Sequence, residues 1–371
     1  MNDFQTTLYT DLVHLVETNE AFFCSDQYHD NTHYKIFNYR LASYSNFLLP
    51  GALECRGVMF EMDSTGQVVR LASLPLHKFF NLNECPFTMN LDLTTIERIM
   101  VKSDGSLISS YMHGDSLRLK SKGSLASDQA LDAMTWIEQY EHSEFKQKVL
   151  HYTKHNHSVI MEWVGPDNRI VLGYNKPQLI VLHVRNNETG KYRSNIQSVF
   201  AGYMPDELPI DTPIEFVESI PSMKEDIEGF VCMLEDGPWF KIKTLKYLAK
   251  HKTKDSVNCP RRLFEAVIEE ASDDMRSMFF DDPQAIKLID DMELFVDHHY
   301  NHMVNNVEVF YASNEQLARK SYAILAKSEL DNKEFGLAMG LYIGREVDYK
   351  ATMKKNWKSY GILNKTKSID E

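Results

Sequence analysis

The sequence predicts an α+β protein built from a sheet-rich domain over residues 1–250 and an all-helical domain over residues 251–371. Three observations support this prediction. Short runs rich in β-branched and aromatic residues, separated by glycine, proline and asparagine, dominate the first part. Apolar residues at helical spacing dominate the second part. The composition, with 43% hydrophobic and 25% charged residues, is that of an ordinary globular protein.

Most elements expected in the first domain are strands, because their residues alternate between apolar and polar or favour β-structure. The expected strands cover residues 34–44, 55–63, 68–73, 96–100, 107–112, 116–122, 158–164, 178–186, 229–235 and 239–243. One helical stretch, roughly 126–153, interrupts them. Its apolar residues fall near helical spacing at Met134, Ile137, Tyr140, Phe145, Val149 and Tyr152.

The pattern changes after about residue 252. The segment 263–279 places its apolar residues on one helical face, and Pro283 stands near the start of the next such segment, 284–310. The strings ASNEQLARKSYAILAKSEL and FGLAMGLYI continue the helical pattern. No repeat and no low-complexity tract interrupts the chain.

Composition narrows the class of protein. No apolar run has the length of a membrane helix, and the N-terminus MNDFQTTLYT lacks the shape of a signal peptide, so we expect a cytoplasmic protein. The five cysteines are scattered without CxxC spacing, which disfavours a disulfide framework and a structural zinc site. With a net charge of −13, the protein would need a local basic site to handle nucleic acid.

The string VKSDGS places Lys102 at the lip of a hairpin or tight bend between two expected strands. A surface turn is the ordinary interpretation of such a lysine. The alternative is a nucleophile, because a lysine amine surrounded by other positive charges is more readily freed from its proton. The rest of the chain has to decide between them.

Other charged residues occur inside expected strands. Glu162 lies in the apolar run VIMEWVG, and a carboxylate there must face water or have a partner. Lys241 and Lys243 alternate along FKIK and therefore share one strand face, and Lys120 and Lys122 repeat this spacing. Each feature alone is typical of an amphipathic strand. Together with Glu228, they favour a site for polyphosphate, ribose and a divalent metal.

The order of these features gives a resemblance. The strings KSDGS, KSKG, EWVGP, EGFV and FKIK, in this order, resemble the motif set of covalent nucleotidyltransferases, which include ATP-dependent DNA ligases, RNA ligases and capping enzymes. The strings LECRGVMFEMD, HKFFNLNE, PFTMN and VRNNETG are similar to those of the bacteriophage RNA ligase 1 family. The resemblance covers roughly residues 20–250, and extends weakly to 270–279.

The resemblance implies a role for each matching residue. Lys102 would be the adenylylated nucleophile, Glu162 would bind the ribose, and Glu228 would serve the metal-assisted steps. The nucleotide and its phosphates would be contacted by Tyr39, Arg56, Lys78, Lys241 and Lys243. Weaker roles in RNA binding or single steps fall to Ser109, Lys120, Lys122 and Tyr247, and Asp273 would lie near a metal.

The resemblance also implies a fold and a reaction. An N-terminal nucleotidyltransferase domain of antiparallel sheets with flanking helices would precede an all-helical domain that favours tRNA. With ATP and Mg²⁺, or Mn²⁺, the protein would join RNA 5′-phosphate and 3′-hydroxyl ends through lysyl-AMP and RNA-adenylate. The implied task is repair of cleaved tRNA anticodon loops by a monomer, after a polynucleotide kinase/phosphatase, in the cytoplasm of the phage host.

Alternatives remain open from the sequence alone. A DNA ligase or capping enzyme usually carries a β-barrel after the last motif, whereas the sequence here becomes helical. A non-catalytic RNA-end binding protein would not need the intact charged motifs. The lysines of the C-terminal segment form either a solvated helix surface or a phosphate contact; they are Lys350, Lys354, Lys355, Lys358, Lys365 and Lys367. No P-loop motif is present.

Overall fold

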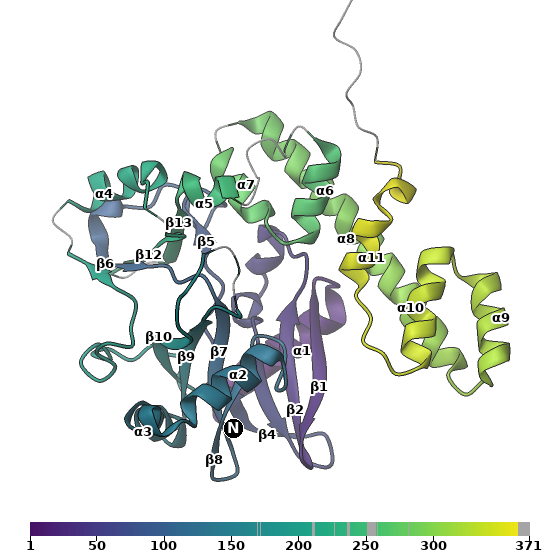
Figure 1. The fold of residues 1–371 in the computed structure, drawn as a ribbon, viewed down its shortest axis with the longest axis horizontal. Coiled ribbons are helices and arrows are strands. Elements are labelled where there is room, and N and C mark those ends of the chain that lie inside the picture. The colour runs from purple at the N-terminus through teal and green to yellow at the C-terminus, as the bar shows by residue number, and fades with distance from the viewer. Residues whose placement is uncertain are drawn as a thin grey trace, which may run out of the picture. The chain divides into compact units, whose positions relative to one another are not determined.

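The computed structural model describes residues 1–168, 170, 172–209, 212–225, 227–235, 238–250 (only the backbone of 249 and 250), 257, 259–280 and 282–362. The chain forms two compact units, Met1–His251 and Lys252–Glu371. The first is a mixture of antiparallel sheets and helices, and the second is helical, which confirms the predicted α+β class (Figure 1).

The first sheet forms around the N-terminal helix. Its four strands, in the order β1-β2-β3-β4, are antiparallel: β1 (Phe22–His29), β2 (Thr32–Tyr39), β3 (Val58–Met62) and β4 (Val68–Ser73). Helix α1 (Asp3–Thr18) begins with a capping box between Asn2 and Gln5. It buries Leu8, Leu12 and Leu15 in one core with the sheet. Neither α1 nor β1 was expected from the sequence.

The second sheet has the order β10-β9-β7-β8, with β7 (Ser106–His113), β8 (Ser116–Ser121), β9 (His157–Val164) and β10 (Gln178–Asn186). The expected helical stretch forms two helices, α2 (Asp128–Ile137) and α3 (Ser143–Lys154), which share a core with this sheet. Side chains of the first two sheets meet in a further cluster of Tyr34, Ile36, Met59, Ala72, Tyr111 and Leu125. Two sheets therefore form a layered body.

The third sheet carries the C-terminal strands of the first unit. Its order is β11-β6-β12-β13-β5, with β5 (Phe80–Asn81), β6 (Ile96–Val101), β11 (Glu207–Leu208), β12 (Gly229–Leu234) and β13 (Trp239–Lys243). Only the β13–β5 pair is parallel among these described strands. Helix α4 (Pro213–Ser219) packs on this sheet through Val217, and α5 (Leu245–Lys250) follows β13.

The second unit consists of helices in its described part. They are α6 (Pro260–Ile268), α7 (Ser272–Met278), α8 (Pro283–Asn314), α9 (Arg319–Glu329), α10 (Asn332–Tyr342) and α11 (Tyr349–Lys355). The expected continuous helix 263–279 is broken, because Glu270 adopts a left-handed conformation with φ 58° between α6 and α7. Buried Arg276 joins α7 to α8 through ion pairs with Asp290 and Glu293.

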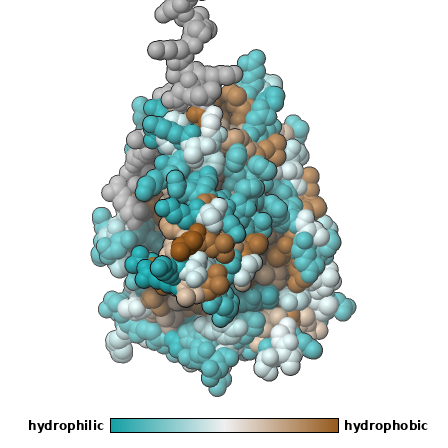
Figure 2. All heavy atoms as spheres, turned by 90° about the vertical axis from the view of Figure 1, so that its right-hand side faces the viewer, coloured by the Kyte–Doolittle hydropathy of each residue, from teal (hydrophilic) through white to brown (hydrophobic). Residues whose placement is uncertain are grey.

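Hydrophilic side chains cover most of the face shown in Figure 2, which is the side that carries α9 and α10 in Figure 1, and apolar residues gather near its centre. Ile324 of α9 is 63% exposed. Within the described residues, no helix combines the length and the apolar character that crossing a bilayer requires.

Candidate active site

Lys102 stands where the chain passes from one sheet to another. It directly follows β6 of the third sheet, and β7 of the second sheet begins at Ser106. The segment 102–105 is therefore a crossover and not the tip of a hairpin, which corrects one of the two forms expected. The backbone N–H of Lys102 donates to Gly229 O at 2.9 Å, so the neighbouring strand β12 fixes its position.

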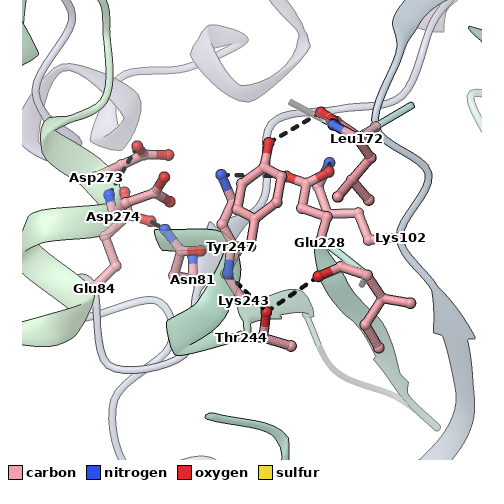
Figure 3. A network of polar contacts seen from close by, with 12 residues as sticks. Asn81, Glu84, Lys102, Leu172, Glu228, Lys243, Thr244, Tyr247, Asp273 and Asp274 are labelled. Atoms are coloured by element: carbon pink, nitrogen blue, oxygen red, sulfur yellow. Dashed lines mark hydrogen bonds and ion pairs between the residues drawn. The ribbon is translucent and has the colours of Figure 1, made fainter. Parts of the chain in front are cut away.

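Glu228 binds two of the predicted lysines (Figure 3). Its Oε2 accepts from Lys102 Nζ at 2.8 Å, and its Oε1 lies 3.2 Å from Lys243 Nζ. Burial by itself would raise the pKa of Glu228, but Lys102, Lys243 and Lys241 outweigh it and hold that pKa below its ordinary value. The carboxylate therefore stays ionised and bridges the ends of β6 and β13.

This pairing differs from the electrostatic setting expected for Lys102. The sequence suggested an amine surrounded by positive charge, whereas the structure places a carboxylate directly against it. An ion pair favours the ammonium form of a lysine. Lys102 is thus held in place by the Glu228 carboxylate, and its Nζ is not free for another contact while this ion pair persists.

Glu162, which is half-buried, is the second carboxylate of the cluster. On β9 it pairs with Leu107 of β7 and Ile180 of β10, so two strands fix its backbone. Burial raises the pKa of Glu162 to about 7; Lys102 and Arg56 oppose this shift, and Glu228 adds to it. Glu162 therefore lies within electrostatic range of the Lys102–Glu228 pair, as the motif order predicted.

Asp104, the acid of the KSDGS string, organises the loop around Lys102. Its Oδ1 accepts from Tyr247 Oη at 3.0 Å, its Oδ2 accepts from Leu172 N at 2.7 Å, and its own N–H donates to Tyr174 Oη at 2.9 Å. The sequence analysis gave Asp104 no role, although its place inside the motif was a signal. Tyr247 is thereby placed at the site, beside Lys243, whose Nζ lies 5.2 Å from its ring centroid.

Two glycines permit the close approach of these segments. Gly229 has φ 156°, and a Cβ there would lie 1.9 Å from Ile242 O. A Cβ on Gly105 would lie 2.3 Å from Trp163 O. No side chain fits at such distances, so glycine is required where β12 meets β13 and where the loop after Lys102 meets β9.

Arg56 contributes an unsatisfied donor to this region. Its Nη1 is buried and has no hydrogen-bond partner among the described residues. A buried donor without a partner is costly, and an anionic ligand would satisfy it. Because Arg56 also lowers the pKa of Glu162, its guanidinium lies within electrostatic range of that carboxylate.

Tyr39, Lys78 and Lys122 form an aromatic and cationic cluster. Lys122 Nζ lies 4.3 Å from the centroid of the Tyr39 ring. Lys78 Nζ lies 5.8 Å from that ring and 5.1 Å from the Phe80 ring. Such a cluster offers a ring face for a base and ammonium groups for phosphates.

A buried network holds the segments that carry Arg56 and Lys78. Arg185 of β10 donates to both carboxylate oxygens of Glu54 at 2.6 Å and to Pro75 O at 2.8 Å. Tyr192 Oη lies 2.6 Å from His77 Nδ1 and accepts from the His77 N–H at 3.2 Å. Glu54 lies two positions before Arg56, and His77 lies one position before Lys78. The network therefore fixes the backbone next to both candidate phosphate-binding residues.

Lys120 and Ser109, which were given weaker roles from the sequence, are both buried. Lys120 is 0% exposed, and its Nζ donates to Gly57 O at 2.8 Å and to Ser121 O at 2.9 Å. Burial lowers its pKa to about 7. Ser109 is buried and accepts from Ser73 Oγ at 3.1 Å. Through its bond to Gly57 O, Lys120 holds the backbone directly after Arg56.

Asp273 belongs to the other unit, in the first turn of α7, where its Oδ1 accepts from the Asp274 N–H at 2.9 Å. Lys350 and Lys354 of the C-terminal segment form ion pairs with Glu270 and Glu269 within the same unit. Two further lysines of that segment, Lys365 and Lys367, lie outside the described residues.

Comparison with known proteins places the chain in a family. A family model described as RNA ligase matches residues 54–255, and one described as the C-terminal domain of T4 RNA ligase 1 matches residues 254–361. A putative bifunctional polynucleotide kinase/RNA ligase of Autographa californica nuclear polyhedrosis virus is 27% identical over 62% of this chain and 35% of its own length. A putative RNA ligase of Thermovibrio ammonificans is 26% identical over 64% of each chain.

The chain thus spans about a third of the first relative and just under two thirds of the second. Among solved structures, an archaeal ATP-dependent RNA ligase has a TM-score of 0.49 at 12% identity over 94% of both chains. A variant of Naegleria gruberi RNA ligase with ATP and Mn has a TM-score of 0.32 at 20% identity over 42% of this chain and 51% of its own. Because the RNA ligase model alone covers more than half of the residues, the chain belongs to the T4 RNA ligase 1 family of RNA ligases.

Proposed function

We propose that this protein is an ATP-dependent RNA ligase that acts through a covalent Lys102–AMP intermediate. The observation that carries the proposal is the Lys102–Glu228–Lys243 cluster at the crossover between two sheets. A lysine that only lies on a surface turn needs no ion pair with a buried carboxylate. It also does not need that carboxylate to contact a second lysine, as Glu228 contacts Lys243. Family membership favours the same reading.

In the first step the neutral Lys102 amine attacks the α-phosphate of ATP. A bond forms between Nζ and phosphorus, the bond to the bridging oxygen breaks, and pyrophosphate leaves with that electron pair. Lys102 must first lose its proton and its contact with Glu228. Lys241, Lys243 and the unsatisfied Nη1 of Arg56 supply positive charge for the phosphates.

The next two steps transfer and then release AMP. The RNA 5′-phosphate displaces Lys102 and takes AMP, and an RNA 3′-hydroxyl then attacks the activated phosphate and expels AMP. Each step is an in-line phosphoryl transfer, so the side chains act by positioning and by neutralising charge. Glu54, His77 and Asp104 contribute by fixing the loops that carry Arg56, Lys78 and Lys102.

The residues fit a divalent cation such as Mg²⁺ or Mn²⁺. Glu228 is ionised and offers carboxylate oxygens, which are the ligands these hard cations prefer. Asp273, in the second unit, is proposed separately as a residue near a metal. When bound, the cation would neutralise charge on the transferred phosphoryl group. The ion pairs of Lys102 and Lys243 with Glu228 would then have to lengthen or break in part.

For the ribose we assign Glu162, and for the adenine Tyr39, with Lys78 and Lys122 beside its ring. We assign nucleotide chemistry to residues 1–250 and RNA recognition to residues 251–371. The substrate would be a broken tRNA anticodon loop whose ends a kinase/phosphatase has prepared. A curated relative whose name couples polynucleotide kinase with RNA ligase supports this order of reactions.

The test uses ATP labelled at the α-phosphate. Purified protein freed of bound AMP is incubated with labelled ATP and Mg²⁺ and separated on a denaturing gel beside Lys102→Ala and the exposed control Lys191→Ala. We expect label on the wild type and the control, none on Lys102→Ala, and release of the label by 5′-phosphorylated RNA. No label on the wild type would overturn the ligase proposal and leave a non-catalytic RNA-end binding protein.

Two further experiments distinguish an RNA ligase from a capping enzyme and from a DNA ligase. Excess unlabelled GTP should not reduce labelling by ATP, whereas a capping enzyme would accept GTP. Release of the label by 5′-phosphorylated DNA and not by RNA would identify a DNA ligase and contradict the assigned substrate.

A further inference from the structure

The tips of two hairpins from different sheets meet at three metal-ligating side chains that the proposed ligase chemistry does not use. His29 ends β1, Asp30 forms the turn before β2, and His113 ends β7 before the turn to β8. One ligand atom from each lies within 4.8 Å of the others, the only such group of three found in the described part of the chain. These hairpins belong to the first and second sheets.

His113 is oriented by a group behind it. Its Nδ1 lies 3.0 Å from the hydroxyl of Tyr34, a fully buried residue, and its Nε2 lies 3.2 Å from Asp30 Oδ2. Without an ion, Nε2–H donates to the carboxylate and Nδ1 accepts from the hydroxyl. When an ion takes the Nε2 lone pair, the ring changes tautomer and Nδ1–H donates to the hydroxyl. A metal-bound histidine is commonly held in this way by a partner on its second nitrogen.

His29 completes the group as a ring with both nitrogens available. Among the described residues nothing hydrogen-bonds to it, and its ring centroid lies 4.3 Å from that of His113. A neutral imidazole nitrogen that has no hydrogen-bond partner is the form of histidine that binds a metal.

We propose that His29, Asp30 and His113 bind one transition-metal ion of the zinc class and that this ion ties the β1–β2 hairpin to the β7–β8 hairpin. Two imidazole nitrogens and one carboxylate oxygen suit Zn²⁺, which takes a fourth ligand from water. Around a tetrahedral zinc the ligand atoms are about 3.3 Å apart, given bonds of about 2.0–2.1 Å. The tips must therefore close slightly on the ion.

The geometry allows this closure. The Asp30 side chain is 79% exposed and sits in a two-residue turn, so rotation about its side-chain bonds can bring the carboxylate inward. Arg118 opposes the binding of a cation, since its charge already acts on His29. The ion would replace the Asp30–His113 hydrogen bond and link the first sheet to the second. Because the ion binds only the folded state, it would raise the stability of the first unit.

The experiment measures Zn²⁺ binding and thermal stability of the full chain after removal of metals with a chelator. We expect one tight equivalent of Zn²⁺ and a higher melting temperature when it is added. His29→Ala and His113→Ala should each abolish that equivalent and the rise in melting temperature. The matched control, His151→Ala with His155→Ala, removes another neighbouring pair of rings, 4.5 Å apart at the C-terminal end of α3, and should retain both.

Two further variants protect the test against misfolding. Asp30→Asn alters one exposed side chain and should weaken Zn²⁺ binding without lowering the melting temperature of the metal-free protein. Tyr34→Phe keeps the ring but removes the hydroxyl behind His113, and should weaken binding by about 10-fold. The proposal is overturned if the wild type binds no Zn²⁺ below millimolar concentration, or if the tight equivalent survives in His29→Ala or is lost in the α3 control.

Discussion

At the scale of single residues, Glu162 gives the clearest dependence on pH. Its folded pKa of about 7 lies above the ordinary value of 4.5, so folding favours the protonated form. The stability that this proton provides is complete below pH 4.5 and is lost as the pH rises toward 7. Glu162→Gln cannot ionise, so its free energy of unfolding relative to the wild type should increase across this window, by on the order of 1–3 kcal/mol.

Denaturant unfolding at pH 4.5, 6 and 8 measures this difference. Glu17→Gln, an exposed carboxylate on α1, serves as the control and should show none of it. A difference between Glu162→Gln and the wild type that stays constant with pH would contradict the assigned protonation.

Tyr247 provides a second prediction for a single atom. Tyr247→Phe removes the hydroxyl that donates to Asp104 Oδ1 at 3.0 Å. Deleting a buried hydrogen bond to a charged acceptor costs about 1–3 kcal/mol of stability, and the loop of Lys102 loses one of its supports. We expect slower Lys102 labelling by ATP and a lower melting temperature. Tyr140→Phe, at a position 93% exposed, should change neither; equal behaviour of the two variants would argue against the support.

At the scale of elements, the contact of β12 with β13 depends on Gly229. Gly229→Ala would bring a Cβ to 1.9 Å from Ile242 O, which no relaxation of a side chain can relieve. The strands must separate, and Glu228 and Lys243 would separate with them. We expect a loss of several kcal/mol, measured by denaturant unfolding, and no labelling of Lys102.

Gly66→Ala is the matched control for that prediction. Gly66 also has a positive φ, 80°, but nothing lies within 4 Å of its Cβ position. Its substitution therefore reports backbone strain alone, about 1–2 kcal/mol. If both alanine variants lost the same stability, steric contact between β12 and β13 would not be the cause.

The buried network around Arg185 gives a prediction about positioning. Tyr192→Phe removes the hydroxyl that holds both the ring and the N–H of His77, next to Lys78. Because Lys78 is assigned to substrate phosphates, the KM for ATP should rise several-fold, with a smaller effect on kcat. Tyr28→Phe, at an exposed ring stacked on His33, should leave both constants unchanged. A fall in kcat with constant KM would indicate a different role for the network.

The sequence predicted the positions of helices and strands wherever the spacing of apolar residues within the element is regular. Strands β7 to β10 and helix α8 follow directly from alternating or helical spacing. Helix α1 was missed because its polar residues outnumber its buried leucines, although the pair Asn2 and Gln5 matches a capping box. The break at Glu270 depends on a single left-handed residue, which periodicity does not register.

Long-range contacts explain what the sequence could not predict about the site. The structure brings together Lys102, Glu228 and Lys243, which the motif order had linked, but that order could not show that a carboxylate lies directly against Lys102. Lys120 and Lys122 share a strand face, but Lys120 is buried and donates to Gly57 O, a contact that the sequence does not reveal. The ion pair of Arg185 with Glu54 spans 131 positions, beyond any local pattern.

At the scale of the whole molecule, net charge limits how the proposed RNA substrate could be bound. The net charge is −13, so nonspecific attraction to phosphates is weak and binding depends on local basic groups. Lys350 and Lys354 already form ion pairs with Glu270 and Glu269, which cancels most of their attraction for an anion. The solvated-surface interpretation of the C-terminal segment therefore fits these two lysines better than a phosphate contact does.

The salt dependence of RNA binding tests that interpretation. Each phosphate neutralised on a single strand contributes about 0.7 to the slope of log affinity against log salt concentration. We expect Lys350→Ala with Lys354→Ala to leave that slope unchanged between about 50 and 200 mM salt, because neither ammonium releases a counterion from RNA. A reduction of about 1.4 in the double variant would instead place both lysines on the RNA backbone.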